Sequence, residues 1–377
     1  MTSACDAIVL GAGIVGTACA MELADAGMRV TIVEPGVIGG GATAAGMGHI
    51  VVMDDSPAQL ALTQYSQQLW HALAPHLPPA AEYETPGTLW VAVDDTEMQE
   101  AIRKQAIYAA LDLPARILDA KALLREEPNL RPGLAGGLLV PSDAVLYPPV
   151  AADYLLQQAL RSGASLVRQT ALRAGDGKVH LAGGETLRAP RLINALGAAA
   201  PSLTPGIPVR PRKGHLVITD RAPGFLRHQL VELGYVRSAG SGTADSVAFN
   251  VQPRKTGQVL IGSSRQYSAQ DKSVDHAILR RMMQQARLYM PGLDRLSVLR
   301  TWTGFRAATP DKLPLIGPHP ADPTLFLATG HEGLGIATAL ATGKLLRHIL
   351  TGSGSAIPVE PYLPARALQL TPETPHA

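Results

Sequence analysis

The stretch that decides the fold is Ala7-Ile8-Val9-Leu10-Gly11-Ala12-Gly13-Ile14-Val15-Gly16. Its first four residues are apolar without interruption, which is typical of a strand buried on both faces. Three glycines follow with GxGxxG spacing, and residues 17–27 continue as an amphipathic helical pattern that ends in glycine. A second strand, Thr31-Ile32-Val33, ends at Glu34. This order of strand, glycine turn, helix, strand and acid predicts a βαβ unit.

Each part of this unit has a physical role in binding a dinucleotide. Gly11 permits the tight turn, Gly13 lets the backbone approach a pyrophosphate, and Gly16 lets the helix pack closely on the strand. The first helical turn offers its N–H groups to the phosphates, and Glu34 can accept hydrogen bonds from a ribose 2′-hydroxyl, which disfavours NADP. The pattern leaves FAD and NAD open. The residues expected to contact the dinucleotide are Gly11, Gly13, Ile14, Val15, Gly16, Glu34 and Pro35.

A segment rich in small residues at 39–49 follows the second strand and favours FAD. Such a run leaves room for a bulky cofactor to lie against the backbone, and the Thr43 hydroxyl can bind a phosphate or ribitol oxygen. A flexible linker is the alternative, but the run contains no Ser and no charge and soon gives way to apolar Ile50-Val51-Val52. We therefore expect FAD contacts from Gly41, Ala42, Thr43, Ala45, Gly46 and Met47.

Composition excludes several classes of function. The chain has 377 residues, of which 46% are hydrophobic and 17% charged, and this is typical of a globular protein. Its net charge of +2 is spread along the chain, so nucleic acid is not expected as a partner. No uncharged apolar stretch reaches the ~18 residues of a membrane span, and we expect a cytoplasmic protein.

The two cysteines, Cys5 and Cys19, form neither a CxxC pair nor a disulfide framework. Their scarcity fits a reducing compartment, and we expect no metal site. An iron–sulfur cluster needs about four Cys ligands, or Cys with His. A cluster that works with this chain would therefore sit on another subunit.

The chain resembles the D-amino-acid-oxidase-type FAD oxidoreductases, the group that includes glycine and sarcosine oxidases. The resemblance covers nearly the whole chain. Residues 47–55 and 249–254 are most similar to the catalytic beta subunits of D-hydroxyproline dehydrogenase and of opine oxidases. Besides the segments above, the similarity rests on residues 87–92, 127–130, 192–198, 211–215, 304–306, 309–311, 314–317 and 328–336.

The resemblance implies FAD as cofactor, with further contacts from Val167, Ala195 and Gly197. A buried core valine is the alternative reading of Val167. A second strand–glycine–helix junction would direct a helix start at the flavin pyrimidine edge, where its dipole stabilises the anionic reduced flavin. The alternative interpretation of His331 and Glu332, which lie in this junction, is a pair of solvent-exposed loop side chains. The contacts expected from this junction are Gly330, His331, Glu332, Gly333, Leu334, Gly335 and Ile336.

Arg306 is the best candidate for binding the substrate. The resemblance aligns it with the arginine that holds the amino-acid carboxylate, and a planar guanidinium binds a carboxylate through two parallel hydrogen bonds. A structural salt bridge is the alternative. The chain departs from the family pattern at two positions: Ala307 replaces the usual proline, and Gly333 falls about where glycine oxidases carry another substrate-contacting arginine. We therefore expect a roomier pocket.

Three further residues are candidates for the reacting end of the site. Met47 matches a residue that lines the flavin face, and Asn250 stands near a family tyrosine and could hydrogen-bond a ring hydroxyl or an amine. Asn250 could equally pin a strand. His49 could act as a base or as a covalent flavin anchor, although a hydrogen-bonded structural histidine is the simpler interpretation. The substrate can give its Cα hydride directly to flavin N5 when its amine is neutral, so no strong protein base is required.

The fold class predicted is α/β, with a discontinuous Rossmann-like FAD-binding domain and an antiparallel-sheet substrate domain. The cofactor segments place the first domain at 1–80, 143–205 and 303–377, and the second at 81–142 and 206–302. Strand-like segments at 83–93, 216–220, 248–253 and 259–264 would build the second sheet. Helical runs at 59–73, 97–110 and 275–289 would flank it, and 358–364 would be an extended strap.

These observations predict an FAD-dependent dehydrogenase that oxidises the C–N bond of a small amino or imino acid of the D-hydroxyproline or D-proline type. The hydride would pass from the substrate to flavin N5. The resemblance further implies a second flavin-type subunit and a small iron–sulfur subunit as partners. The alternatives are a glycine or D-amino-acid oxidase that uses oxygen, an opine oxidase catalytic subunit, and a non-catalytic FAD-holding subunit. An NAD dehydrogenase is the least favoured.

Overall fold

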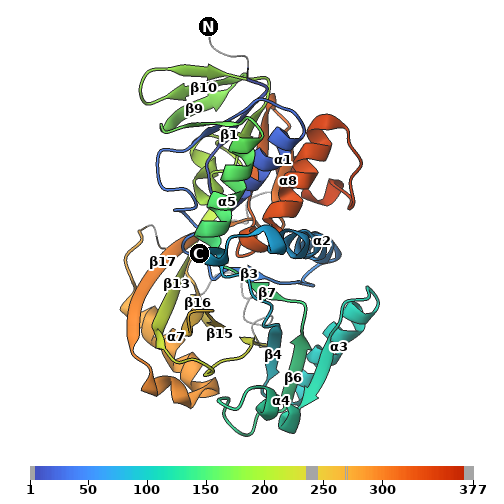
Figure 1. Cartoon of the computed structure of the whole chain (residues 1–377), viewed down its shortest axis with the longest axis vertical. Coiled ribbons are helices and arrows are strands. Elements are labelled where there is room, and N and C mark those ends of the chain that lie inside the picture. The colour runs from blue at the N-terminus through green and yellow to red at the C-terminus, as the bar shows by residue number, and fades with distance from the viewer. Residues whose placement is uncertain (1–4, 235–244, 268, 270, 369–377) are drawn as a thin grey trace, which may run out of the picture.

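The computed structural model describes residues 5–234, 245–267, 269 and 271–368. Figure 1 shows a main sheet in each half of the molecule, with the small β9–β10 sheet beyond the first of them. Both main sheets take strands from widely separated parts of the chain. Within the described ranges, no helix is long and apolar enough to cross a membrane.

The first main sheet contains the glycine turn. Its strand order is β18-β19-β12-β1-β2-β8, and all neighbours are parallel except β18 and β19. The central strand β1 is buried at all four residues, as expected for a parallel sheet covered on both faces. The bounds are β1 (Ala7–Leu10), β2 (Val30–Val33), β8 (Ser165–Val167), β12 (Leu192–Asn194), β18 (Leu315–His319) and β19 (Asp322–Thr329).

Three helices pack together beside this sheet (Figure 1). α1 (Ile14–Asp25) contacts both α5 (Pro148–Arg161) and α8 (Gly335–Thr351). Most of α1 is buried, so its apolar residues pack on nearly every side and not along one stripe. The approach to α8 is close, since a Cβ at Gly343 would lie 2.8 Å from the Ala18 carbonyl oxygen.

The second main sheet has the order β17-β13-β16-β15-β14-β4-β6-β5. The expectation of an antiparallel sheet is confirmed for all pairs except β14 and β4, which are parallel. The bounds are β4 (Thr88–Ala92), β5 (Arg116–Asp119), β6 (Gly136–Val140), β13 (Arg210–Arg221), β14 (Gln229–Glu232), β15 (Ser246–Pro253), β16 (Gln258–Arg265) and β17 (Val298–Ala308).

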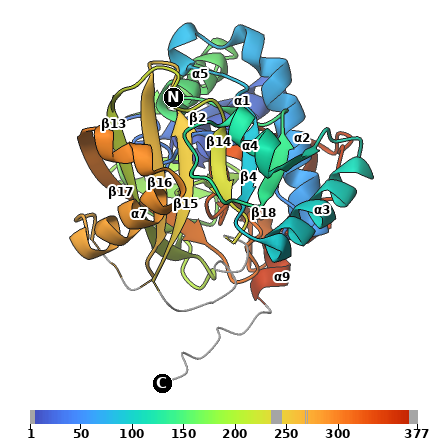
Figure 2. The ribbon, with the colours of Figure 1, turned by 90° about the horizontal axis from the view of Figure 1, so that it is seen from below.

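Helices cover the face of this sheet that is turned away from the first sheet (Figure 2). α7 (His276–Tyr289) packs on β15 and β16, and its first turn is capped by the Asp275 carboxylate, which accepts from two backbone N–H groups. The rings of Phe249 and Tyr289 stack with centroids 4.3 Å apart. α3 (Asp95–Ala109) and α4 (Ala120–Glu126) pack near β4, β5 and β6. The opposite face of the second sheet is therefore turned toward the half of the molecule that contains the glycine turn.

Two expectations about the periphery are wrong. The helix expected at 59–73 is present as α2 (Pro57–Leu73), but it packs mainly against α8 instead of flanking the second sheet. Residues 358–364 are not extended, because η5 (Glu360–Tyr362) and the start of α9 (Pro364–Leu368) occupy them. The Tyr362 ring is buried and its hydroxyl donates to the Ala58 carbonyl, which favours a compact turn.

Each strand of the first sheet lies within 1–80, 143–205 or 303–377, and each strand of the second sheet lies within 81–142 or 206–302, as expected. The exception is β17 of the second sheet, which extends across residue 303. The domain boundaries themselves stay a prediction. A three-stranded sheet within 143–205 was not expected from the sequence. The remaining elements are β3 (His49–Ile50), β7 (Ala144–Val145), β9 (Ala171–Gly175), β10 (Lys178–Leu181), β11 (Thr186–Arg188), η1 (Ala74–His76), η2 (Pro79–Ala81), η3 (Gly197–Ser202) and η4 (Pro291–Arg295).

Candidate active site

The glycine turn between β1 and α1 leaves no room for a side chain at Gly11 or Gly16. Gly11 has φ +100°, and a Cβ there would lie 3.0 Å from the Ala195 carbonyl oxygen. A Cβ at Gly16 would lie 2.0 Å from the Gly11 carbonyl oxygen, so the helix and the turn are packed backbone to backbone. α1 begins after Gly13 without a side-chain cap from that residue and without an acidic residue in its first turn. Such a helix start suits a phosphate.

Glu34 ties the end of β2 to this turn. One carboxylate oxygen accepts from the Ala12 N–H at 2.9 Å, and the other accepts from the Gly36 N–H at 2.8 Å. The Glu34 N–H donates to the Val167 carbonyl at 3.1 Å, so β2 and β8 end side by side. A cavity of about 560 Å³ lies next to them, lined by residues 35–38, Asp153 and Arg168. Of the predicted contacts, Pro35 lines this cavity, while Glu34 and Val167 each stand next in sequence to a residue that does.

The small-residue loop is held between the two halves of the molecule. The Thr43 hydroxyl accepts from the Ile14 N–H at 3.0 Å, which fixes the loop to the start of α1. A Cβ at Gly46 would lie 2.6 Å from Ile336 Cδ1, and a Cβ at Gly304 would lie 2.3 Å from Ala45 Cβ. Because both contacts are tight, residues 43–46 lie against α8 on one side and against β17 on the other. Gly41 and Ala42 precede them on the same loop.

The starts of α1 and α8 lie close together. A Cβ at Gly335 would lie 3.8 Å from Val15 Cγ2, and α8 also lacks a side-chain cap at its N-cap residue, Leu334. The strand that precedes this junction is fixed by Thr329, whose hydroxyl donates to the Gly197 carbonyl at 3.0 Å. Two helix N-termini whose N-cap residues provide no side-chain cap therefore lie in one region. This arrangement suits a ligand that carries negative charge at two places.

The interpretation of His331 and Glu332 as a solvent-exposed pair is wrong. His331 is buried and its Nε2 lies 2.9 Å from the Thr342 hydroxyl of α8, while burial lowers its pKa to about 3. Glu332 forms an ion pair with Arg212 of β13, and its backbone N–H donates to the Ala307 carbonyl at 2.9 Å. Both side chains therefore hold the junction against its neighbours.

One face of the second sheet is turned toward the loop that carries Met47, and we call it the inner face. Alternate residues of a strand share a face. Gly304 of β17 adjoins Ala45, and Gly262 of β16 adjoins Met47, with 3.1 Å between a Cβ there and Met47 Sδ. Met47 packs with three of its residues, Leu216, Leu260 and Trp302. The inner face also carries Arg212 and Gly214 of β13, Asn250 and Gln252 of β15, and Arg306 of β17.

Arg306 lies across the neighbouring strand. It is paired directly with Arg212 in the β13–β17 register, and its Nη1 donates to the Ser264 carbonyl of β16 at 2.9 Å. A Cβ at Gly214 would lie 2.4 Å from that nitrogen, so glycine is what lets the guanidinium pass over β13. Gly333 adjoins the same side chain, since a Cβ there would lie 3.5 Å from Arg306 Nε. The position where the sequence predicted extra room is thus next to Arg306.

The buried polar atoms of this region that have no hydrogen-bond partner within the described structure include Asn250 Oδ1, Gln252 Oε1, His49 Nε2 and Trp302 Nε1. Leaving such an atom unsatisfied costs about 1–3 kcal/mol, so a cluster of them indicates a polar group bound from outside the chain. Gln252 is oriented by its Nε2, which donates to the Met47 carbonyl at 3.0 Å. The residues therefore fit a large polar cofactor and a small polar substrate.

Sequence reasoning missed Gln252, although the segment that contains it was singled out. The available signal was its spacing of two from Asn250 on a predicted strand, which places both amides on one face. Of the candidate catalytic residues, Arg306, Met47 and Asn250 all lie on or against the inner face. His49 lies on β3 beside them, since both Gln252 and Arg306 are close enough to shift the pKa of its imidazole.

His49 is expected to stay neutral at physiological pH. Burial lowers its pKa to about 4, the nearby charge of Arg306 acts in the same direction, and contact with Gln252 opposes them. The His49→Asn variant should therefore keep the midpoints of the pH profile of kcat/KM between pH 5.5 and 8, even if its absolute activity falls. A midpoint near pH 6–7 that disappears in the variant would contradict this, because it would show a histidine that gains a proton in that range.

A buried carboxyl supports the segment between His49 and the second sheet. Asp143 accepts from the Val52 N–H at 3.2 Å and from Gln67 Nε2 at 2.8 Å. Burial raises its pKa to about 7, and these hydrogen bonds only partly offset the effect. The folded chain thus keeps a proton that the unfolded chain releases near pH 4, so this group weakens stability as the pH rises from about 4 to about 7.

We expect Asp143→Asn to remove that pH dependence. The asparagine oxygen can still accept from Val52 and Gln67, but it does not titrate. The free energy of unfolding of the parent should fall relative to the variant by up to about 4 kcal/mol between pH 4 and pH 8. Urea unfolding at both pH values measures this, and parallel curves for the two proteins would show that Asp143 is ionised throughout.

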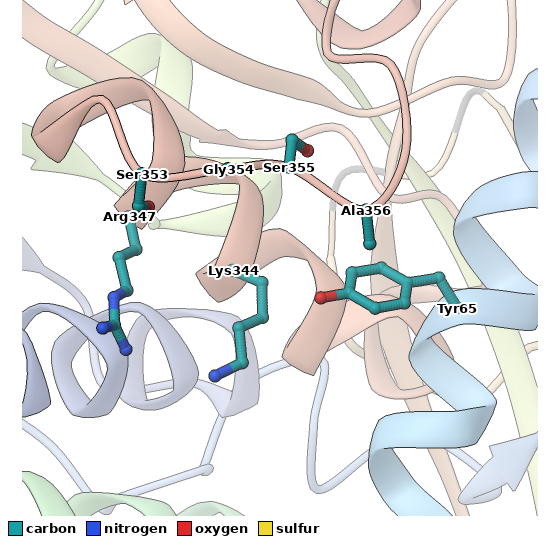
Figure 3. A pocket seen from close by; sticks show the side chains of 7 residues that line it. All are labelled: Tyr65, Lys344, Arg347, Ser353, Gly354, Ser355 and Ala356. Carbon is teal, nitrogen blue, oxygen red and sulfur yellow. The ribbon is translucent and has the colours of Figure 1, made fainter.

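A further pocket of about 280 Å³ lies at the end of α8 (Figure 3). Lys344 and Arg347 line it, and their charged ends both pair with the buried carboxylate of Glu22 in α1, at 2.9 and 3.4 Å. Because α8 starts at Gly335 and this pocket adjoins its last turn and residues 353–356, it lies at the far end of the helix from Ile336. We assign it no part in the site.

Three comparisons with known proteins bear on this arrangement. Residues 6–349 match the protein family described as DAO, FAD dependent oxidoreductase. The chain is 30% identical to a glycine oxidase of Pseudomonas aeruginosa, over 96% of this chain and 99% of that protein. It is 28% identical to the HcnC subunit of hydrogen cyanide synthase of the same organism, over 96% of both chains. The crystal structure of glycine oxidase from Geobacillus kaustophilus superposes with a TM-score of 0.86 at 25% identity, covering 96% of this chain and 98% of that one.

Proposed function

This chain belongs to the DAO family of FAD-dependent oxidoreductases, which acts on the C–N bonds of amino acids, and from that premise we propose that its substrate is a small imino acid. D-Hydroxyproline or D-proline is the first candidate, on the similarity of residues 47–55 and 249–254 to the corresponding dehydrogenase subunits. FAD, when bound, would supply the acceptor for the hydride that leaves the carbon next to nitrogen.

The observation that carries the proposal is the position of Arg306. Its guanidinium lies over Gly214, against Gly333, on the face that packs on Met47. A carboxylate held there by two parallel hydrogen bonds would place the rest of the substrate along the inner face. Position 333 carries no side chain, which supports a substrate bulkier than glycine.

The amide oxygens of Asn250 and Gln252 are the proposed partners of the substrate amine. Both are buried and lack a partner within the described structure, and an amide oxygen accepts from an amine N–H. They would orient the nitrogen lone pair that becomes the second bond of the C=N product. Met47 would exclude water from the reacting carbon, because its side chain is buried between the loop and the sheet.

The test is an anaerobic titration of the purified yellow protein with D-hydroxyproline, D-proline, glycine, sarcosine and an opine. We expect the flavin band to bleach first with a cyclic imino acid. Bleaching by glycine alone would overturn the substrate proposal. A band that persists with all five, in a protein that retains FAD, would favour a non-catalytic FAD-holding subunit.

Admission of air then separates the electron acceptors. A dehydrogenase should recover its colour slowly, whereas fast recovery with peroxide would favour the second candidate, an oxidase that uses oxygen. That candidate is supported by the two glycine oxidases to which the chain is similar. An opine oxidase subunit would be recognised in the same titration by its preference for the opine.

The proposal includes partners and a compartment. We propose a complex with a second flavin-type subunit and a small iron–sulfur subunit, supported by the resemblance and by a relative that is itself named a subunit, HcnC. We also propose a cytoplasmic location, because Cys5 and Cys19 are both free thiols in the structure. Purification of the tagged chain from its own cell, followed by iron and flavin analysis, tests the complex.

A further inference from the structure

The hydrogen-bond ladder between β13 and β16 is interrupted beside Arg306. Lys213 and Gln266 exchange two backbone hydrogen bonds. Regular pairing resumes at Val217 and Ile261, four residues further along β13 but five residues back along β16. β16 therefore carries one extra residue here, which makes a β-bulge. Such a bulge disrupts the ladder locally and can redirect groups toward a neighbouring site.

Ser264 lies in this bulge and uses its side chain where a regular strand would use its backbone. If the register of Lys213 and Gln266 continued, the His215 N–H would donate to the Ser264 carbonyl. Instead, the His215 N–H donates to the Ser264 hydroxyl at 2.9 Å. The Ser264 carbonyl accepts from Arg306 Nη1, also at 2.9 Å. The hydroxyl thus takes the ladder position of the carbonyl, and the carbonyl is directed to the guanidinium.

The ring of His215 holds the same hydroxyl. Its Nε2 accepts from the Asp275 N–H at 3.0 Å, so the proton of the neutral ring is on Nδ1. Nδ1 lies 2.9 Å from the Ser264 hydroxyl and donates to it. Burial, together with the charge of Lys213, lowers the pKa of His215, which keeps the ring neutral at physiological pH. The residue that caps α7 therefore fixes the tautomer, and the tautomer fixes Ser264.

Burial makes these hydrogen bonds effective. Ser264 and His215 are each 1% exposed, so water does not compete with either side chain, and the interior strengthens their interactions. The bond from Arg306 to the Ser264 carbonyl has a charged donor, which makes it about twice as strong as a neutral one. Gly214 lies on the other side of the same nitrogen, since a Cβ there would lie 2.4 Å from Arg306 Nη1. The bulge thus locates one end of the guanidinium.

We infer that Ser264 and His215 are positioning residues for Arg306. The Ser264 hydroxyl occupies the β13 backbone so that the Ser264 carbonyl stays with the guanidinium, and His215 holds that hydroxyl in place. The inference rests on the proposed function, because the carboxylate that Arg306 binds belongs to it. It explains how a long side chain on β17, the edge strand of the sheet, is ordered before the substrate binds and loses little rotamer freedom on binding.

The first experiment compares a charged probe with its neutral counterpart. Pyrrole-2-carboxylate is a flat relative of proline, and pyrrole-2-carboxamide has a similar shape without the charge; calorimetry measures their binding to the FAD-loaded protein. The parent should prefer the carboxylate by about tenfold or more. Ser264→Ala lets the His215 N–H return to the carbonyl, so it should weaken the carboxylate about three- to tenfold and the carboxamide less than about twofold. The KM of the substrate should rise by a similar factor while kcat changes little.

A double variant separates positioning from general damage. In Arg306→Leu the carbonyl has no guanidinium to hold, so adding Ser264→Ala should cause no further loss of carboxylate affinity. Ser66→Ala is the matched control, because Ser66 is also buried and its hydroxyl also accepts a backbone N–H, that of Ala341, at 3.3 Å. The control should lower the melting temperature and leave the preference for the carboxylate unchanged. A loss from Ser264→Ala that is equal with and without Arg306 would overturn the inference.

Two variants of His215 keep different halves of the ring. The side-chain nitrogen of the His215→Asn variant can replace Nδ1 and donate to Ser264, whereas the side-chain oxygen of the His215→Gln variant can replace Nε2 and accept from Asp275. His215→Asn should keep the carboxylate affinity within about twofold, and His215→Gln should lose about threefold or more. The reverse order would show that the histidine only holds the start of α7, and it would overturn the role of His215.

The outcomes of the two proposals are distinguishable. If glycine alone bleaches the flavin, the substrate proposal fails, but the test of Ser264 stands, because glycine carries the same carboxylate. If Arg306→Leu binds pyrrole-2-carboxylate as tightly as the parent does, the carboxylate role of Arg306 fails and the inference fails with it. If Arg306→Leu loses this affinity while Ser264→Ala and His215→Gln keep it, only the inference is overturned.

Discussion

Replacing Arg306 with leucine should lower kcat/KM by about 10² to 10³, with most of the loss in KM. The reason is that truncating one partner of a buried, hydrogen-bonded charge pair costs about 2–5 kcal/mol. The guanidinium donates a hydrogen bond to the Ser264 carbonyl and lies over Gly214, where no side chain displaces it. It is therefore already in position before the substrate binds. Steady-state kinetics with the substrate identified by the flavin titration measures the effect.

Two companion variants separate binding from folding. Arg306→Lys keeps the charge but loses the parallel hydrogen bonds, and it should recover only part of the loss. Gly214→Ala leaves Arg306 in the chain but brings a methyl group to within 2.4 Å of its nitrogen, so the guanidinium has to move and KM should rise. All three should retain the flavin spectrum. Unchanged kinetics in Arg306→Leu would remove Arg306 from the site.

Replacing Gly16 with alanine should abolish FAD binding and destabilise the fold. The new methyl group would lie 2.0 Å from the Gly11 carbonyl oxygen, which is backbone and cannot turn aside as a flexible side chain can. Relief requires α1 to move away from the turn, and α1 is buried against α5 and α8. We expect a colourless protein whose melting temperature is clearly lower, or one that does not accumulate in soluble form.

Gly13→Ala is the informative partner of that variant. Its methyl group would meet only the Thr43 hydroxyl, at an ordinary contact distance of 3.4 Å, so the fold should persist while the approach of the pyrophosphate is obstructed. Gly354→Ala, where a Cβ meets nothing within 4 Å, serves as the neutral control. Full FAD content in Gly16→Ala would contradict the assignment of the turn as the dinucleotide site.

The cofactor half was predictable from sequence because its determinants are local. Gly11 and Gly16 stand five residues apart and touch each other, and the order of strand, turn and helix fixes what they do. Thr43 and Glu34 were predicted to bind the ligand, and the structure adds that they also brace the turn through Ile14 and Ala12. These hydrogen bonds depend on the folded backbone, so the spacing of residues in the sequence does not predict them.

The substrate face was only partly predictable, because its register depends on irregular pairing. β15 and β16 shift register between Val247 and Asn250, and an alternation pattern cannot locate such a shift. His331 was misread for a related reason, since its partner Thr342 lies on the far side of a turn, two helical turns into α8.

The parallel pairing at the centre of the first sheet has a consequence for how the chain matures. Ile8 pairs with Leu192, and Ile193 pairs in turn with Phe326, so the sheet joins both ends of the sequence. Contacts between such distant residues form late and slowly. During synthesis β1 would keep one edge unpaired until residues near 194 have left the ribosome, and β12 would keep one edge unpaired until residues near 327 have done so. We therefore expect FAD to bind only after β19 has been synthesised, and a chain truncated before β19 to be degraded rather than stored as a partial flavoprotein.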